Sequence, residues 1–274
     1  MAIFRNLVTF GPFASLVPLL ARLDSTVLCA RHLGSSHRGK TTLRNSASGA
    51  ATRVLTALAS APINRAIERE RHRLLADKQL LGQDTPFDAA VTVSEACAVS
   101  KSPRQAALLA AIVRAFSPRH AIELGTNVGI SSAYIASAME GTLVTLEGST
   151  CRHKLARELH VNLGLTNVEY VTGMFADTLR TALDQMPEVD FAFIDGHHEY
   201  QATLDYSESI IGRAKPGAVF VFDDIRWSPG MHAAWSRLKA DPRFGLVVDF
   251  WSMGVGVLRT GNESHTTTEP ITCY

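Results

Sequence analysis

The sequence predicts an α/β protein built on a doubly wound sheet of seven strands, five of them parallel and two forming a closing antiparallel hairpin. From residue 100 onward, short apolar runs alternate with helical stretches, which is typical of a parallel sheet covered by helices on both faces. The last two apolar runs are separated only by Trp251 to Gly254, whereas a parallel crossover needs about a dozen residues. These two strands therefore close the sheet as a hairpin.

The individual elements follow from local patterns. Ser102 and Pro103 are suited to a helix N-cap and first helical position, so a helix is expected from there to about Phe116. The expected strands are His120–Leu124, Thr142–Leu146, Val168–Thr172, Phe191–Ile194, Ala218–Phe222, Leu246–Phe250 and Val255–Leu258. Further helices are expected near 130–139, 151–162, 176–186, 199–213 and 231–240.

Four zones divide the chain. Residues 1–60 form a basic, partly helical arm or a targeting segment, because the first 67 residues hold one acid, Asp24, against eight Lys and Arg. Residues 61–99 form a helical N-terminal extension, 100–259 the domain that contains the sheet, and 260–274 a flexible tail. The apolar part of the arm needs a partner surface, so a homodimer is expected.

Composition argues against several classes of protein. A formal net charge of +1 gives no reason to expect binding to nucleic acid. No apolar run reaches the ~20 residues that span a bilayer; the nearest, Leu7 to Leu20, is short and contains two prolines. The four cysteines lie far apart without metal-ligand spacing, which favours a reducing compartment. A cytoplasmic protein is expected, with organelle targeting through the basic N-terminal segment as the alternative.

The turn after the first predicted strand has the composition of a nucleotide-type loop. Gly125 at the strand exit allows positive φ and close approach of a ligand, and Thr126, Gly129 and Ser131 in the same turn and helix start are expected to bind the cofactor with it. The start of the helix presents free N–H groups to such a ligand. Position 127 is Asn where a dinucleotide-binding loop has its central glycine, which argues against a nicotinamide-dependent oxidoreductase.

Two glutamates near strand ends limit the class of ligand that this turn would bind. Glu123 lies on a buried strand, where an isolated charge is costly, and a sulfonium-bearing amino acid with a free ammonium group would offset that cost. Glu147 lies 22 residues after Gly125 and precedes Gly148, at the place where an acid accepts both ribose hydroxyls. Phe175, after the third strand, is expected either to wall an adenine or to pack in the core.

Acidic and histidine side chains follow the fourth and fifth strands. Asp195, His197 and His198 follow the fourth, and Asp223 and Asp224 follow the fifth, at the carboxyl edge where doubly wound sheets bind ligands. Three interpretations stay open. The aspartates hold Mg²⁺ or a similar ion that lowers the pKa of a substrate hydroxyl; His198 or His197 removes the proton directly; or Asp195 holds a ligand ammonium while the Asp pair caps the next helix.

The segment from about Ala121 to Arg259 resembles the Rossmann-like domain of class I S-adenosylmethionine-dependent methyltransferases of the small-molecule O-methyltransferase type. The motifs that carry the resemblance are Glu-Leu-Gly-Thr with Gly129, Glu147, "FIDGHHEY", "FDDIRWS" and the closing hairpin. The resemblance implies S-adenosylmethionine as cofactor and a small-molecule hydroxyl acceptor.

Cation-dependent, catechol-type members of that family extend the expectation to the catalytic groups. Their pattern implies metal ligands at Asp195, Asp223 and Asp224. These relatives carry a lysine base three residues after the first Asp, where this chain has His198, so a histidine base is the natural substitute.

The sequence leaves open the roles of two residues and the type of reaction. Trp227 and Met231 follow the fifth strand and either cover the acceptor or pack the next helix. Beside the O-methyltransferase interpretation stand an enzyme that uses the same cofactor for non-methyl chemistry and a non-catalytic binding or scaffold protein.

Overall fold

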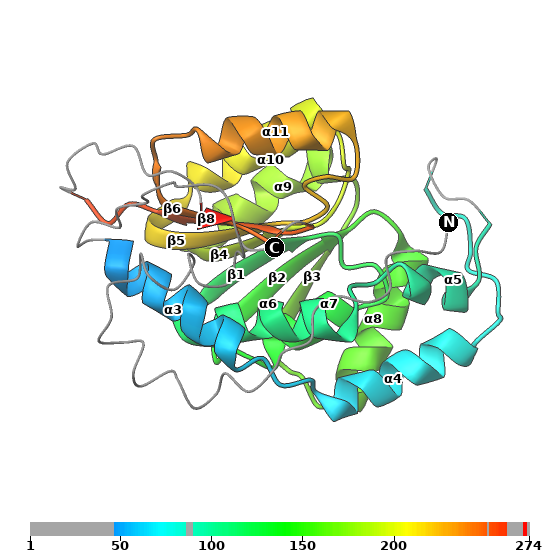
Figure 1. Cartoon of the computed structure of the whole chain (residues 1–274). Coiled ribbons are helices and arrows are strands. Elements are labelled where there is room, and N and C mark those ends of the chain that lie inside the picture. The colour runs from blue at the N-terminus through cyan, green and yellow to red at the C-terminus, as the bar shows by residue number, and fades with distance from the viewer. Residues whose placement is uncertain (1–46, 86–89, 251, 262–270, 273–274) are drawn as a thin grey trace.

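A computed structural model describes residues 47–85, 90–250, 252–261 and 271–272 of the chain (Figure 1). Most of the predicted N-terminal arm, residues 1–46, lies outside the described residues, as does most of the predicted tail. Within the described ranges, no helix is both long and apolar enough to cross a membrane.

One mixed sheet forms the centre of the molecule, in the order β3-β2-β1-β4-β5-β7-β6-β8. Its strands are β1 (His120–Leu124), β2 (Thr142–Glu147), β3 (Val168–Thr172), β4 (Val189–Ile194), β5 (Ala214–Phe222), β6 (Phe244–Asp249), β7 (Gly254–Leu258) and β8 (Ile271–Thr272). Strands β1 to β5 are parallel, and β7 is antiparallel to both β5 and β6. The predicted sheet of five parallel strands closed by a hairpin is confirmed. The two-residue β8, which the sequence placed in the tail, pairs in parallel with β6.

The helices alternate with the strands as expected. They are α3 (Ala47–Ala59), α4 (Arg65–Ala76), α5 (Val93–Ala98), α6 (Pro103–Phe116), α7 (Ile130–Ala136), α8 (Thr150–Asn162), α9 (Phe175–Gln185), α10 (Tyr200–Ile211) and α11 (Pro229–Lys239). The side chain of Ser102 accepts a hydrogen bond from the Gln105 N–H and closes a capping box, so α6 begins where the sequence predicted.

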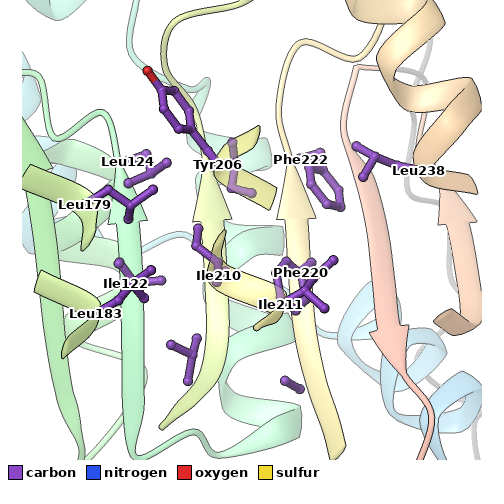
Figure 2. Close-up of a cluster of buried hydrophobic side chains, with 14 of the residues drawn as sticks. Ile122, Leu124, Leu179, Leu183, Tyr206, Ile210, Ile211, Phe220, Phe222 and Leu238 are labelled. Atoms are coloured by element: carbon purple, nitrogen blue, oxygen red, sulfur yellow. The ribbon is translucent and has the colours of Figure 1, made fainter. Parts of the chain in front are cut away.

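Helices cover both faces of the sheet, with α9, α10 and α11 on one face and α3, α6 and α7 on the other (Figure 1). Figure 2 shows the first of these layers, where apolar side chains of β1 and β5 lie beneath side chains of α9, α10 and α11. All six residues of β4 are buried, which explains why Phe191–Ile194 is apolar without alternation, and the buried Asp190 before them pairs with Lys215. Burying each large apolar side chain contributes about 1.5–3 kcal/mol, so the two layers hold the strand ends in fixed positions.

The N-terminal extension packs against the sheet domain. The Tyr134 hydroxyl of α7 donates a 2.9 Å hydrogen bond to Glu68 of α4, and Arg71 pairs with the same carboxylate at 2.8 Å. Farther along, Asp84 accepts hydrogen bonds from the Ser149 hydroxyl (2.7 Å) and the Cys151 N–H (2.8 Å) at the start of α8. The extension therefore reaches the edge of the sheet at which β2 ends.

Candidate functional site

The ends of β1 and β4 form the centre of the site. The sheet order reverses between these two strands, and ligands of doubly wound folds bind in the crevice at such a point. Gly125 follows β1 with φ +102°, and a Cβ there would collide with the backbone carbonyl oxygen of Asp195. Asp195 in turn donates its N–H to the Leu124 carbonyl at 2.9 Å. Glycine is required here because the two strand exits touch.

The other glycine of the turn has a different role. Gly129 has φ +91°, and a Cβ there would meet Ala156 of α8 at 2.8 Å and the His160 ring at 3.1 Å. The His160 Nε2 also lies 3.0 Å from the Gly129 carbonyl oxygen. The structure therefore uses Gly129 for the close packing of α7 on α8.

A buried polar network lies beneath the turn. The Thr145 hydroxyl of β2 donates to Glu123 at 2.6 Å and lies 2.5 Å from the Thr126 hydroxyl. The ring of His153 extends the chain, with Nε2 3.1 Å from Thr126 and Nδ1 2.7 Å from Thr172. Thr126, predicted to bind a cofactor, thus points into the protein. Neither Thr145 nor His153 was predicted, because a threonine within a strand and a histidine on a helix give no sequence signal.

Burial sets the protonation of Glu123. Its pKa is raised to about 8: removal from water is the largest cause, the hydroxyls of Ser131 and Thr145 oppose the rise, and the charges of Asp195 and Glu147 add to it. The free carboxyl group is therefore mostly protonated at pH 7. A cationic group bound nearby would favour its ionised form.

Glu147, at the end of β2, is held in place by two backbone donors. Its Oε2 accepts from the Asn127 N–H at 2.8 Å, and its Oε1 accepts from the Ser149 N–H at 3.0 Å. Asn127 has a left-handed backbone, with φ 47°, which turns its N–H toward this carboxylate. A carboxylate has about four acceptor positions, so two remain for a ligand. A Cβ on the neighbouring Gly148 would lie 3.4 Å from the Met174 sulfur, so Met174 borders this strand end.

Phe175 lies against the exit of β4. A Cβ on Gly196 would be 2.6 Å from the Phe175 ring, and that ring contacts Tyr206 edge-on with centroids 5.9 Å apart. Phe175 therefore borders the crevice and packs on the core at the same time, which leaves both interpretations made from the sequence in place.

Asp195, His198 and Asp224 form an acidic cluster at the ends of β4 and β5, with ligand atoms all within 4.8 Å of one another. The His198 Nε2 lies 3.7 Å from Asp195 Oδ1 and 3.8 Å from Asp224 Oδ2. Burial lowers the pKa of His198, and the Asp224 carboxylate opposes that effect. Burial raises the pKa of Asp195 to about 7, opposed by the charge of Lys101. At neutral pH His198 is therefore a neutral imidazole beside two acidic groups.

Asp223 lies apart from this cluster of three. Its side chain is fully buried, and its carboxylate contacts the ammonium of Lys101, which is itself only 9% exposed. The same ammonium lies 3.7 Å from Asp224 Oδ1. Lys101 was not predicted, since it precedes α6, far in sequence from the strand ends that carry the motif.

Side-chain contacts and exposure bear on the residues that follow β5. The cap of α11 is Ser228, whose hydroxyl accepts from the Met231 N–H at 3.1 Å, so the idea that Asp223 and Asp224 cap this helix is wrong. Met231 is 3% exposed and packs in the core, whereas the side chain of Trp227 is 73% exposed. Trp227 alone of this pair can meet a ligand.

His197 faces away from the acidic cluster. Its Nδ1 lies 2.9 Å from the Tyr206 hydroxyl, and its Nε2 lies 3.6 Å from Glu199. A left-handed backbone at His197, with φ 53°, separates its direction from that of His198. Of the two histidines, only His198 is brought together with the aspartates.

Comparisons with known proteins agree with this geometry. Residues 122–225 match a family model described as a methyltransferase domain. A catechol O-methyltransferase from Mycobacterium tuberculosis is 31% identical over 155 residues, which cover 54% of this chain and 69% of that protein. The chain belongs to the class I S-adenosylmethionine-dependent O-methyltransferases.

Other relatives of this O-methyltransferase extend the comparison. A catechol O-methyltransferase from Niastella koreensis is 28% identical over 132 residues, which cover 47% of this chain and 59% of that protein. Two solved structures share the fold. An O-methyltransferase from Bacillus cereus in complex with SAH has a TM-score of 0.58 and 23% identity, covering 76% of this chain and 97% of that one. TomG from Streptomyces achromogenes, in complex with SAM, has a TM-score of 0.55 and 19% identity, covering 79% and 100%.

Proposed function

We propose that this O-methyltransferase transfers the methyl group of S-adenosylmethionine to a hydroxyl of a small-molecule acceptor at the carboxyl edge of β1, β2, β4 and β5. One observation carries the proposal. The glycine turn after β1 and the acidic cluster after β4 are in direct contact through Gly125 and Asp195. A cofactor seated on the turn would therefore reach the cluster with its reactive end.

The cofactor would be held by groups on both sides of that contact. Glu147 has acceptor positions left for two ribose hydroxyls, and its orientation is fixed by the Asn127 and Ser149 N–H groups. The ammonium group of the methionine part would lie near Glu123 and Asp195, where its charge would offset the burial that raises the pKa of both carboxyl groups. Phe175 would border the adenine.

His198 is the group proposed to remove the acceptor proton. Bound S-adenosylmethionine would give its methyl group to the hydroxyl oxygen and leave as a neutral thioether, and the proton of the hydroxyl would pass to His198 Nε2. The lowered pKa of His198 keeps the imidazole neutral and able to accept a proton. Asp195 and Asp224, at 3.7 and 3.8 Å, stabilise the imidazolium that results. The exposed Trp227 ring is the proposed cover of the acceptor.

The residues of the acidic cluster also fit a divalent cation. Two carboxylates and an imidazole with ligand atoms within 4.8 Å suit Mg²⁺ or a transition metal, held by Asp195, His198 and Asp224. Such an ion would lower the pKa of the acceptor hydroxyl. His198 would then be a ligand, so the two arrangements exclude each other. Full activity in the presence of EDTA would support His198 as the base and contradict the metal-bound arrangement.

Binding of S-adenosylhomocysteine tests the proposal. Calorimetric titration of the full chain, with and without Mg²⁺, is expected to show one site. Glu147→Gln should weaken that site by about tenfold or more, because the amide loses charge and acceptor positions. Glu169→Gln, the same change on the exposed face of β3, should leave the affinity unchanged. A wild-type chain that binds no S-adenosylhomocysteine would refute the proposal. Mass spectrometry of the reaction products would distinguish methyl transfer from other chemistry, and the absence of any product would indicate a scaffold role.

Two further proposals concern the whole chain. The apolar arm of residues 1–60 supports a homodimer, which light scattering would test against a strict monomer. The four separated cysteines support a cytoplasmic location, and cell fractionation would distinguish it from an organelle.

A further inference from the structure

Lys101 brings a positive charge into the acidic cluster from outside the strand ends. It lies directly before Ser102, the N-cap of α6, and its side chain is 9% exposed. Its ammonium contacts the buried carboxylate of Asp223 and lies 3.7 Å from Asp224 Oδ1. Its charge also acts on Asp195, whose pKa it lowers against the effect of burial.

The charges of this region explain why the lysine is there. Asp195, Asp223 and Asp224 are three carboxylates within two strand ends, and buried carboxylates are costly unless they are paired. An ammonium group has three donors and no lone pair, so Lys101 offsets one negative charge of this group but cannot act as a metal ligand. With its carboxylate against Lys101, Asp223 is withdrawn from the three ligands that face one another.

A divalent cation would need the Asp224 carboxylate, whose Oδ1 lies 3.7 Å from the Lys101 ammonium. Two positive charges held about 4 Å apart repel strongly even where the protein screens them well. Binding of the cation therefore requires either that this repulsion be tolerated or that the lysine withdraw from Asp224.

We propose that Lys101 is the resident counter-ion of the acidic cluster and competes with a divalent cation for its carboxylates, which weakens divalent-cation binding at Asp195, His198 and Asp224. The proposal rests on the cation site suggested under the proposed function and adds a residue that controls the affinity of that site.

Binding of Mn²⁺ to the full chain tests the proposal. Free Mn²⁺ is measured by electron paramagnetic resonance with saturating S-adenosylhomocysteine present. Lys101→Met keeps the length of the side chain and removes the charge, and it should bind Mn²⁺ about tenfold more tightly or better than wild type. Lys101→Arg keeps the charge and should bind within about twofold of wild type. Lys154→Met removes the same charge from the exposed face of α8 and should also match wild type.

Wild-type affinity in Lys101→Met, or no Mn²⁺ binding by that variant, would overturn the proposal. Lys101→Gln is a second uncharged variant in case the first does not fold, and S-adenosylhomocysteine affinity shows that the pocket is intact. In the wild type, acetylation of Lys101 should also become faster with saturating Mg²⁺ while that of Lys154 stays constant, and an unchanged rate would contradict competition. A failure of the proposed function is seen separately, as absent S-adenosylhomocysteine binding.

Discussion

His198 and Asp224 follow neighbouring strands, and their Nε2 and Oδ2 atoms lie 3.8 Å apart. Asp224 reaches this position through a left-handed backbone, with φ 49°, directly after the fully buried Asp223. A conformation of this kind costs a non-glycine residue about 1 kcal/mol and persists only where surrounding contacts impose it. The backbone therefore aims two consecutive aspartates at different partners, Asp223 at Lys101 and Asp224 at the imidazole.

This pairing predicts the effect of removing the imidazole. His198→Asn should lower kcat by about a hundredfold or more while leaving the affinity for S-adenosylhomocysteine within about twofold. The acid limb of the pH–rate profile, where a protonated His198 cannot accept the proton, should disappear as well. The matched control is His197→Asn, since His197 contacts Tyr206 and not the aspartates, and its kcat should change by less than about threefold. Equal losses of kcat in both variants would mean that the substitutions had changed the conformation of the loop, and would contradict a role for His198 as the base.

Cofactor binding is expected to release a proton. Glu123 has a pKa of about 8 in the free protein and is mostly protonated at pH 7, and the ammonium of a bound cofactor would lower that pKa. Calorimetry at pH 7 in buffers of different ionisation enthalpy should show up to about one proton released per cofactor. Cofactor binding to Glu123→Gln should release fewer protons than binding to the wild type, and the difference should equal the contribution of Glu123. Identical proton release in the variant would assign it to other groups.

The sheet could be predicted because apolar patterns report local burial. The runs of β1 to β7 and the short connection between Leu246–Phe250 and Val255–Leu258 determine strand number and direction by steric arguments alone. The carboxyl-edge residues followed from the same logic, since Glu147 ends a strand, Asp195 directly follows one, and Asp224 is the second residue after one.

The partners of those residues could not be predicted, because they come from elements distant in sequence. Lys101 approaches Asp223 from the loop before α6, and His153 reaches Thr126 from α8. The direction of a side chain could not be predicted either. The adjacent side chains of His197 and His198 point to different partners because His197 has a left-handed backbone, with φ 53°. Gly129 shows a third case, in which a motif glycine serves helix packing.

The two buried histidines of α8 predict acid sensitivity. Burial lowers the pKa of His153 and of His160 to about 4 each, with the Arg157 charge adding to the effect at His153. Since the unfolded chain protonates these groups near pH 6.5, the stabilisation they give is complete above that pH and is lost as pH falls toward 4. In urea titrations across this range, His153→Gln should reduce the slope of unfolding free energy by up to about 1.4 kcal/mol per pH unit. His232→Gln, on the exposed face of α11, should leave the slope unchanged.

The contact between the strand exits predicts that position 125 accepts only glycine. Gly125→Ala places a methyl group against the Asp195 carbonyl oxygen. Moving Asp195 away would disturb the hydrogen bond that its N–H donates to the Leu124 carbonyl. The substitution also forces alanine to φ +102°. We expect a loss of about 3 kcal/mol or more in unfolding free energy, together with loss of S-adenosylhomocysteine binding. Gly164→Ala separates the two causes, since Gly164 has φ +70° but nothing within 4 Å of an added Cβ. That control should cost only about 1 kcal/mol, so equal losses in the two variants would show that backbone strain, not the contact with Asp195, makes Gly125 necessary.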